Sequence, residues 1–573
     1  MNDAAPMAEA GTWLGRFADA FAGHDVVAAL SLFTDDCYWR DLVAFTWNVK
    51  TLEGKLQIAA MLEATLRSTE PRDWTVMRAQ RTVEGIEAWF DFATKVGRGL
   101  GIFRLEHGKC RTILTTLQSL TGHEERLGAT RSFGVTHGAD RNRETWTERR
   151  AREEAALGTT EEPYCLIIGG GQGGIMLGAR LKQLGVPTII VERNAKAGDS
   201  WRKRYRSLVL HDPVWYDHLP YLPFPQTWPV FTPKDKMGDW LEIYVKTMEL
   251  SYWGSTECVK AEFDDTAKRW AVDLVRDGKP VTLHPAQIVF ATGAYGPPKR
   301  LELPGADGFD GEILHSSEYS DGARYAGKRC VVIGGASSGH DVSVDLWEAG
   351  ADVTMVQRSP TTVVRSETLM ELAFDMYSEQ AVAAGIDVDT ADLIAAATPF
   401  ALQPAAQRAL YDRIRAKDAA FYEKLAATGF LLDFGPDDTG LMMKAYRTGS
   451  GYYVDVGASK LIIDGEIKVK SGVEIERLTP TGIRLTDGTE LPAEVIIQST
   501  GFQSMHEMVA KIVSRDVADR IGTCWGLGSP SIATARPRSA SSCTTRRSPT
   551  PAPRSTRPAR RWTRSSTRST PAS

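Results

Sequence analysis

Hydrophobic and polar positions follow one another in blocks that predict strands and helices in a repeated order. An apolar run, Cys165–Ile168, leads into a glycine-rich stretch, a segment with helical spacing from Ile175 to Gly185, and a second apolar run, Pro187–Val191. The same order returns between residues 330 and 357. Short apolar runs that alternate with helices indicate parallel strands that are buried on both faces. The pattern therefore predicts an α/β protein with two doubly wound, Rossmann-like domains.

The first glycine-rich stretch has the spacing of a dinucleotide-binding turn. Gly169, Gly171 and Gly174 stand between a strand and a helix, and Glu192 follows the second strand. In such a turn the glycines permit a tight bend, a close approach of the pyrophosphate and close packing of helix on strand, while the acid binds ribose hydroxyls. We expect these four residues and the adjacent Arg193 to bind a dinucleotide.

The second glycine-rich stretch differs from the first at two informative points. Gly334, Ser338 and Gly339 form the turn, but Ala336 occupies the position of the middle glycine. Arg358 follows the second strand of this unit, where an NAD-binding unit has a carboxylate. Because a guanidinium binds a 2′-phosphate, this site is predicted to take NADPH. The alternative is an exposed arginine in a turn.

The N-terminal segment has a different pattern, which predicts a separate α+β domain. Helical spacing from Trp13 to Phe33 gives way to alternating, strand-like segments such as Ala88–Ala93 and Gly101–Glu106. The order resembles that of the cone-shaped SnoaL-like domains of the NTF2-like fold. Asp36 and Asp41 are candidate acid/base residues of such a cone, although a structural role for both is the favoured interpretation.

Composition and charge exclude several classes of function. The 573 residues carry a net charge of −4, have no apolar run long enough for a membrane span, and open without a cationic and apolar leader, so we expect a cytoplasmic protein without a membrane partner. The body lacks a basic face, which disfavours nucleic acid. The seven cysteines contain no C-x-x-C pair, so neither a metal site nor a dithiol-flavin reductase is predicted.

Four further motifs, in a fixed order, resemble those of class B flavin-containing monooxygenases, in the branch that includes the plant YUCCA enzymes. They are the loop ending at Trp201 with Leu208-x-Leu210-His211-x-Pro213, the linker Ala291-Thr292-Gly293, the sequence Phe309-x-Gly311-x-x-x-His315-x-x-x-Tyr319, and Ser499-Thr500-Gly501-Phe502. The third is the most specific of them, with Tyr319 in place of a tryptophan. The resemblance covers residues 164–502.

The resemblance implies an FAD- and NADPH-dependent monooxygenase, of the N,N-dimethylaniline monooxygenase type, that inserts one atom of O2 into a small organic substrate through a C4a-hydroperoxyflavin. It further implies that Trp201, Thr292, Gly293, Thr500 and Gly501 contact the cofactors, and that His211 and His315 serve the reaction, with His315 in a hinge-like role. An NADPH oxidase-like or inactive flavoprotein is the alternative. The substrate stays open among amines, sulfides, ketones and 2-oxo acids, and so does a homodimer.

The expected division is an NTF2/SnoaL-like domain at 1–135, a charged linker at 136–162, an FAD-binding domain at 163–300 and 481–528, and an NADPH-binding domain with a helical insertion at 301–480. Residues 529–573 consist almost wholly of Ser, Thr, Arg, Pro and Ala. This composition predicts a disordered tail, and a shifted reading frame near codon 529 would explain it.

Overall fold

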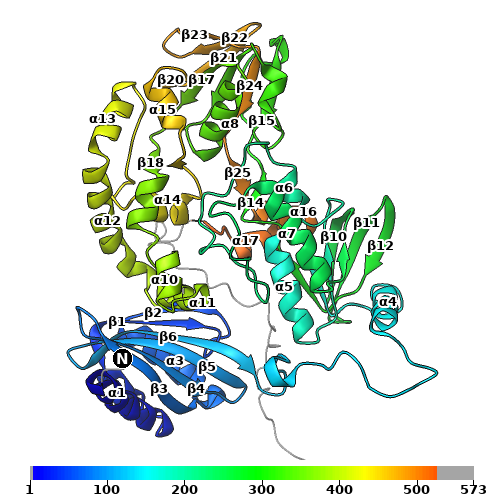
Figure 1. Ribbon diagram of the computed structural model, residues 1–573, viewed down its shortest axis with the longest axis vertical. Coiled ribbons are helices and arrows are strands. Elements are labelled where there is room, and N and C mark those ends of the chain that lie inside the picture. The colour runs from blue at the N-terminus through cyan, green and yellow to red at the C-terminus, as the bar shows by residue number, and fades with distance from the viewer. Residues whose placement is uncertain (1–3, 526–573) are drawn as a thin grey trace, which may run out of the picture.

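The computed structural model describes residues 4–525, so the tail predicted at 529–573 lies outside the described residues. Figure 1 shows three bodies: an N-terminal domain at the bottom, a first lobe at the right and a second lobe at the top, with a column of helices on the left. Within residues 4–525 no helix is both long and apolar enough to span a bilayer.

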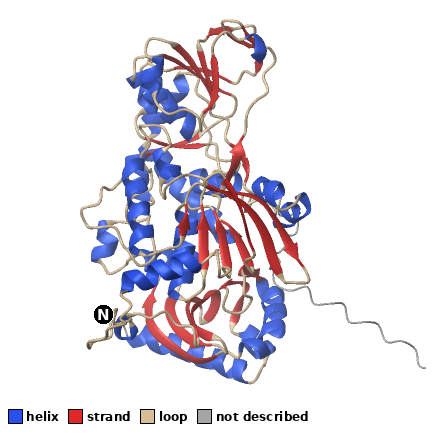
Figure 2. Ribbon diagram, turned by 90° about the vertical axis from the view of Figure 1, so that its right-hand side faces the viewer, coloured by secondary structure: helices blue, strands red, loops and turns tan. Residues whose placement is uncertain are grey.

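The N-terminal domain is a strongly bent sheet wrapped around helices, as the side view in Figure 2 shows. Strand order is β2-β1-β6-β5-β4-β3, and only the β1–β6 pair is parallel. The predicted single helix to Phe33 is two helices, because the chain turns at residues 23–25 and Asp25 caps the second one. The elements are α1 (Ala4–Ala22), α2 (Val26–Ser31), β1 (Phe33–Leu42), β2 (Val49–Glu53), α3 (Gly54–Thr69), β3 (Arg72–Arg81), β4 (Ile86–Ala93), β5 (Gly97–Glu106) and β6 (Lys109–Leu120).

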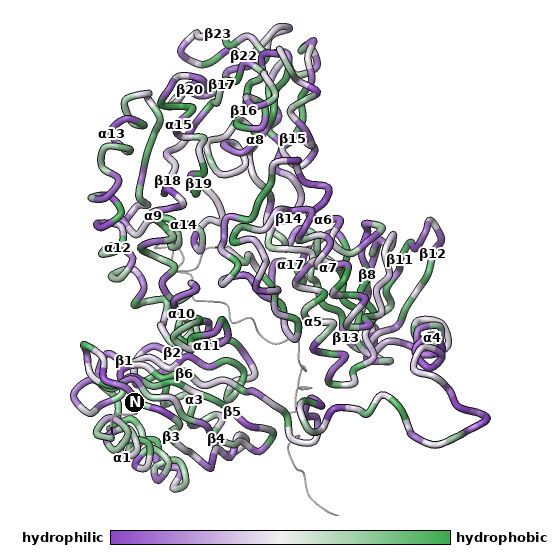
Figure 3. The backbone as a smooth tube through the Cα atoms, viewed as in Figure 1, coloured by the Kyte–Doolittle hydropathy of each residue, from purple (hydrophilic) through white to green (hydrophobic). Residues whose placement is uncertain are grey.

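The connector to the first lobe contains an exposed helix, α4 (Trp146–Ala156), after a short 3-10 turn, η1 (Gly128–Thr130). Thr145 and Glu148 form a capping box at its start, and the helix buries no side chain. The segment is mostly hydrophilic, purple in Figure 3.

The first lobe is built on a parallel sheet of order β13-β7-β8-β9 with an antiparallel meander, β10-β11-β12, beside it. Buried aliphatic side chains from both faces of the sheet form two apolar clusters with the helices and the meander. The elements are β7 (Cys165–Ile168), α5 (Gln172–Gln183), β8 (Thr188–Val191), α6 (Asp199–Arg202), α7 (Lys234–Thr247), β9 (Tyr252–Trp253), β10 (Thr256–Asp264), β11 (Arg269–Arg276), β12 (Lys279–Leu283), β13 (Gln287–Phe290), α16 (His506–Ile512) and α17 (Arg515–Ile521).

The second lobe has a five-stranded parallel sheet, β15-β24-β16-β17-β20, and a small antiparallel sheet, β21-β22-β23. Its elements are η2 (Ala306–Gly308), β15 (Glu312–His315), η3 (Gly322–Tyr325), β16 (Arg329–Ile333), α8 (Ser337–Glu348), β17 (Asp352–Gln357), α15 (Ala458–Ile463), β20 (Lys468–Ser471), β21 (Ile475–Thr479), β22 (Gly482–Leu485), β23 (Glu490–Pro492) and β24 (Val495–Gln498).

This topology corrects one expected boundary. The prediction that the chain re-enters the first lobe at residue 481 is wrong, because β24 pairs with β15 and β16 in the second sheet. An apolar run such as Val495–Gln498 suits either parallel sheet, so its pattern does not identify which sheet it joins. The crossing takes place later, at β25 (Phe502–Ser504), which pairs with β14 (Tyr295–Pro298).

Between the lobes and the N-terminal domain lies the helical insertion, the column on the left of Figure 1. Its two short strands pair with each other in parallel, and Val363 and Tyr453 from them pack in the apolar cluster of the second lobe. Its elements are β18 (Thr362–Arg365), α9 (Ser366–Leu372), α10 (Glu379–Ala383), α11 (Val388–Ala396), η4 (Phe400–Leu402), α12 (Gln403–Lys417), α13 (Ala419–Ala427), α14 (Gly440–Thr448) and β19 (Tyr452–Asp455).

Candidate functional site

The first glycine turn, residues 169–174, joins β7 to α5 in the form that the spacing predicts. Gly169 has φ +113°, and a Cβ there would lie 2.4 Å from the Ala291 carbonyl oxygen. A Cβ on Gly174 would lie 2.0 Å from the Gly169 oxygen, whereas a Cβ on Gly171 would meet no protein atom within 4 Å. Gly169 and Gly174 are thus required by the fold itself. The space beside Gly171 is free for a ligand at the N-terminus of α5.

Glu192 lies directly over this turn. Its side chain is almost fully buried, and one carboxylate oxygen accepts a hydrogen bond from the Gly170 N–H at 2.8 Å. The other accepts from the backbone N–H of Asn194 at 2.9 Å. The neighbouring Arg193 is exposed. The acid is therefore held rigidly beside the phosphate-binding turn, which is the place that a ribose diol requires.

Trp201 and the linker after β13 border the same turn. The Trp201 indole N–H donates to Oε1 of Gln172 at 3.3 Å, within the glycine turn. Thr292 has a buried hydroxyl oxygen without a hydrogen-bond partner among the described residues, and Gly293 has φ +92° with open space around it. A buried hydroxyl without a partner is costly unless a ligand supplies one, so these residues fit a bound flavin dinucleotide.

The second glycine turn, residues 334–339, joins β16 to α8. Cβ atoms on Gly334 and Gly339 would meet the Ser499 and Gly334 carbonyl oxygens at 2.3 and 1.9 Å. Ala336 takes the middle position with an ordinary extended backbone, φ −100° and ψ −172°, and Ser338 is half-buried at the helix start. The methyl group of Ala336 is therefore compatible with the turn. The residues present fit a second dinucleotide.

Arg358 follows β17, at the edge of the sheet where the glycine turn lies. Its side chain is exposed and forms no hydrogen bond or ion pair with residues 4–525. The preceding Gln357 is fully buried, and its amide binds the backbone of Leu431 through both its nitrogen and its oxygen. The strand end that carries the guanidinium is therefore fixed, while the guanidinium itself is available to a phosphate.

His315 connects the two lobes. It is fully buried, and its Nε2–H donates to the Gly501 carbonyl at 3.0 Å, while Nδ1 accepts from the Ser317 N–H at 3.1 Å. Acceptance at Nδ1 requires the neutral imidazole, and burial also lowers the pKa of His315. Next to it, the Thr500 hydroxyl donates to the Lys299 carbonyl. The motif histidine thus fastens β15 to the point where the chain crosses between the lobes.

His211 is not brought into contact with His315 or with either glycine turn. It lies exposed on the loop after Leu210 and forms no hydrogen bond with the described residues. Asp341, near the start of α8, lies within electrostatic range of His211, and burial raises the pKa of the Asp341 carboxyl group. This places His211 at the face of the second lobe that turns toward the first.

The motif residue Tyr319 depends on a partner that the sequence does not reveal. Its hydroxyl donates to Asp345 at 2.6 Å, and the same carboxylate oxygen accepts from the Gly322 N–H at 2.8 Å. Asp345 is fully buried in the middle of α8. A carboxylate on the buried face of α8, between Val342 and Leu346, is the one signal that points to such a role.

Five tyrosines from separate segments gather between the lobes and the helical insertion. The rings of Tyr216 and Tyr377 lie 4.8 Å apart, Tyr446 is within electrostatic range of both, and Tyr295 is within electrostatic range of Tyr452. Asp212 is within range of Tyr216 and of Tyr452, and so joins the two groups. We call the five tyrosines, residues 216, 295, 377, 446 and 452, the tyrosine strip. Only the fold brings them together, so sequence patterns did not identify them.

The two candidate acids of the N-terminal domain have structural roles. Asp41 is fully buried and accepts hydrogen bonds from the Thr115 and Thr46 hydroxyls and from backbone N–H groups of residues 44–46. Asp36 is exposed and forms an ion pair with Arg111. Packed aromatic rings fill the interior of the sheet, among them Trp39 and Phe90. Acid/base chemistry inside this domain is therefore not supported.

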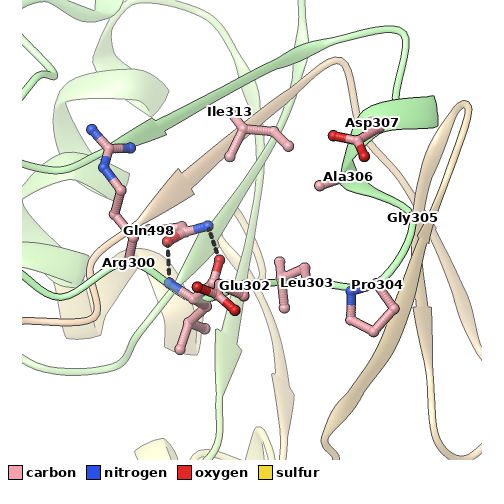
Figure 4. A pocket seen from close by; sticks show the side chains of 10 residues that line it. Arg300, Glu302, Leu303, Pro304, Gly305, Ala306, Asp307, Ile313 and Gln498 are labelled. Carbon is pink, nitrogen blue, oxygen red and sulfur yellow. Dashed lines mark hydrogen bonds between the residues drawn. The ribbon is translucent and has the colours of Figure 1, made fainter.

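Two surface grooves lie apart from both glycine turns. One, of about 590 Å³, follows residues 300–307 and is closed by Ile313 and Gln498, whose amide binds the backbone of Leu301 (Figure 4). The other, of about 470 Å³, lies between β2 and α3. Neither contains a glycine-turn residue, so we assign no cofactor to them.

The cysteines and acids of the described residues do not form a redox or metal centre. Six cysteines are free thiols, five of them buried. No group of three or more His, Cys, Asp or Glu side chains within residues 4–525 could hold a metal ion. Cys37 and Cys110 lie within electrostatic range of each other, but both belong to the core of the N-terminal domain, so the described residues place no dithiol beside the first glycine turn.

Comparisons with known proteins identify relatives of this chain. The family described as pyridine nucleotide-disulphide oxidoreductase matches residues 271–446. Indole-3-pyruvate monooxygenase YUCCA1 of Oryza sativa subsp. japonica is 31% identical over 369 residues, which cover 64% of this chain and 79% of that protein. Indole-3-pyruvate monooxygenase YUCCA4 of the same plant is 28% identical over 354 residues, covering 60% and 74%.

Among solved structures, epsilon-caprolactone-bound cyclohexanone monooxygenase has 21% identity and a TM-score of 0.48, covering 61% of this chain and 76% of that one. The OTEMO complex with FAD and NADP has 18% identity and a TM-score of 0.46, covering 62% and 74%. With 31% identity across 79% of the YUCCA1 relative, the chain belongs to the YUCCA-like family of FAD- and NADPH-dependent flavin monooxygenases.

Proposed function

We propose that the first glycine turn binds FAD, that the second binds NADPH through Arg358, and that the protein transfers one oxygen atom from O2 to a small organic substrate. The observation that carries this proposal is the pair of glycine turns at the ends of two parallel sheets, with Glu192 over one and Arg358 beside the other. When bound, the cofactors supply hydride transfer and oxygen activation. The chain supplies their placement.

Named residues are proposed to hold the cofactors in place and to exclude water from the site. Trp201 and Thr292 border the flavin site, and the proline-rich segment after Leu219 forms a wall, fixed where the Tyr244 hydroxyl donates to the Pro220 carbonyl at 2.6 Å. A dry, shaped site favours oxygen transfer over release of peroxide. His315 is proposed as the positioning residue that holds the lobes in register, and His211 as a contact for NADP⁺.

For the N-terminal domain we propose an NTF2/SnoaL-like fold with a capping role. The bent sheet with α1 and α3 on its inner side supports the fold. The aromatic filling of the interior supports capping over catalysis. A homodimer through this domain stays a proposal, which the molecular mass in solution tests.

The test of the proposed function is the reduction of the purified flavoprotein without oxygen, first by NADPH and then by NADH. NADPH is expected to reduce the flavin faster. Oxygen and a panel consisting of N,N-dimethylaniline, a thioether, a cyclic ketone and an aromatic 2-oxo acid then identify the substrate class by its oxygenated product. A protein that carries no flavin, or that both nucleotides reduce at the same rate, would contradict the cofactor assignment.

A further inference from the structure

One contact of the N-terminal domain is with the helical insertion and is mainly apolar. Trp89, Ile102 and Leu114 of the sheet form a cluster with Ala397 and with partly buried side chains of α11. Arg104 adds a hydrogen bond to the Ala397 carbonyl at 3.3 Å. A second contact is polar and reaches the first lobe. Since the apolar contact holds the domain on the insertion, the role of the polar one follows from what it touches on the first lobe.

The polar contact is made by Glu125, shortly after β6 ends at Leu120. Its Oε1 accepts hydrogen bonds from the Tyr221 hydroxyl and, at 3.3 Å, from Nη1 of Arg180. The same Arg180 nitrogen donates to the Tyr221 hydroxyl oxygen at 3.2 Å, and the guanidinium carbon lies 4.6 Å from the centre of the tyrosine ring. Three groups from distant segments thus form a closed triangle. We call Glu125, Arg180 and Tyr221 the connector triad.

The carboxylate of the triad is withdrawn from solvent, unlike its neighbour in the sequence. Glu125 keeps only 17% of its side-chain surface exposed, whereas Glu124 is exposed and accepts a hydrogen bond from the Gly122 N–H of its own turn. Burial, together with the hydrogen bond to Glu125, raises the pKa of Tyr221 to about 12, so its hydroxyl keeps its proton at neutral pH. Both donors therefore make charge-assisted hydrogen bonds to Glu125.

Tyr221 has a backbone conformation that requires such support. Its φ of +71° lies in the left-handed region, which is unfavourable for a bulky side chain. A conformation of this kind persists only where the surroundings fix it, and it is frequent at functional sites. The triad fixes the Tyr221 hydroxyl, and the Tyr244 hydroxyl fixes the preceding Pro220 carbonyl at 2.6 Å. Side-chain hydrogen bonds thus hold the chain in this turn.

The turn belongs to the proline-rich wall, residues 219–225. Tyr221, Leu222 and Phe224 pack in the same apolar cluster as Trp201, whose indole N–H reaches the first glycine turn. Arg180 lies on α5, the helix that begins at that turn, and the connector passes below this helix in Figure 1. Glu125 therefore bonds to both the wall and the helix that border the proposed flavin site.

We propose that Glu125 is a positioning residue that holds the wall at residues 219–225 closed over the flavin site, through Tyr221 and Arg180. The inference rests on the proposed function and deepens it, because it gives the N-terminal part of the chain a task in excluding water from the reaction. A site that stays dry favours oxygen transfer over release of peroxide.

The first measurement is hydrogen–deuterium exchange of residues 219–228 in the full-length protein, followed by mass spectrometry. E125A and Y221F should each exchange about tenfold faster than wild type, which corresponds to about 1.4 kcal/mol in the opening equilibrium. E125Q should be intermediate, because its amide oxygen accepts a hydrogen bond but carries no charge. The double variant E125A/Y221F should exchange no faster than either single variant, because both remove the same interaction.

Two control variants separate the triad from other effects. E124A changes the adjacent carboxylate, and R104Q weakens the contact with α11; both should exchange at the wild-type rate in residues 219–228. Flavin content and melting temperature verify that each variant is folded.

The second measurement is the formation of peroxide without substrate, in which NADPH, a proton and O2 give NADP⁺ and hydrogen peroxide. E125A should form peroxide several-fold faster than wild type and E124A, because an open wall admits water.

Unchanged exchange in E125A, equal acceleration in E124A or R104Q, or faster exchange without faster peroxide formation would overturn the proposal. The exchange rates need neither turnover nor a known substrate, so they decide on the triad independently of the reaction. A wild-type protein whose flavin NADPH does not reduce would instead refute the proposed function.

Discussion

Replacement of Gly171 by valine separates a ligand contact from a folding requirement. The backbone at Gly171, φ −75° and ψ −175°, is one that any residue adopts, and a Cβ there meets no protein atom within 4 Å. The residue is the N-cap of α5, where valine is less favourable than glycine by about 1 kcal/mol or less. The fold should therefore tolerate the change, whereas a dinucleotide whose pyrophosphate lies against this glycine should not.

Gly173 provides the matched control. It also belongs to the first glycine turn, and a Cβ there also meets nothing within 4 Å, but it is one of the variable positions of the Gly169-x-Gly171-x-x-Gly174 spacing, where the dinucleotide turn does not need glycine. Within the first turn of a helix, valine is better than glycine by a few tenths of a kcal/mol, roughly. G173V should therefore retain its flavin and its stability.

The assay is the flavin-to-protein ratio of the purified protein, together with the melting temperature of flavin-free samples. G171V should hold at least about tenfold less flavin than wild type, a loss of affinity of about 1.4 kcal/mol or more. Its flavin-free form should melt within a few degrees of the flavin-free wild type, since about 1 kcal/mol corresponds to only a few degrees in a large domain. Normal flavin content in G171V, or equal loss in G173V, would refute the assignment.

Three further predictions test other parts of the account. Arg358→Ala should reduce the preference for NADPH over NADH about tenfold. This is the low end for a charge-assisted contact, because the side chain is exposed. An unchanged ratio of the flavin reduction rates with the two nucleotides would contradict the role of Arg358. His340 is fully buried with a pKa lowered to about 4, below its unfolded value, so its contribution to stability is present above pH ~6.5 and is lost as the pH falls toward 4. His340→Phe should therefore show a weaker fall of melting temperature over that range than wild type, and parallel curves would contradict it. Removal of residues 1–155 should leave a body that binds flavin but aggregates, because Leu393 and Ile394 of α11 lose their apolar cover. Replacement of both by serine should restore solubility. A truncation that is soluble without these changes would show that the interface is dispensable.

The sequence predicts the two nucleotide-binding units well because each is a local arrangement. Gly169, Gly171 and Gly174 lie within one strand–turn–helix unit, and the conformation that they need is set by contacts over a few residues and one neighbouring strand. The same holds for Gly334 and Gly339. Spacing alone therefore indicates the turn and the direction from which a phosphate approaches.

Features that depend on distant pairing were not predicted. Val495–Gln498 reads as a buried parallel strand, but only its partners β15 and β16 assign it to the second sheet. For Asp41 the sequence favours a structural role over that of a base, but only the fold shows which five groups, from β6 and the turn after β1, satisfy its carboxylate. Trp89 reads as an ordinary residue of a strand, because nothing in β4 tells that Leu393 and Ile394 of α11, more than three hundred residues later, pack against it.

Incorporation of isotopically labelled O2 tests the central claim most directly. The purified flavoprotein is supplied with NADPH, labelled O2 and the substrate that the product screen identifies, and the product is analysed by mass spectrometry. The account predicts one labelled oxygen atom in each product molecule and about one product molecule for each NADPH consumed. Consumption of NADPH with the label found only in peroxide or water would contradict monooxygenation by this chain.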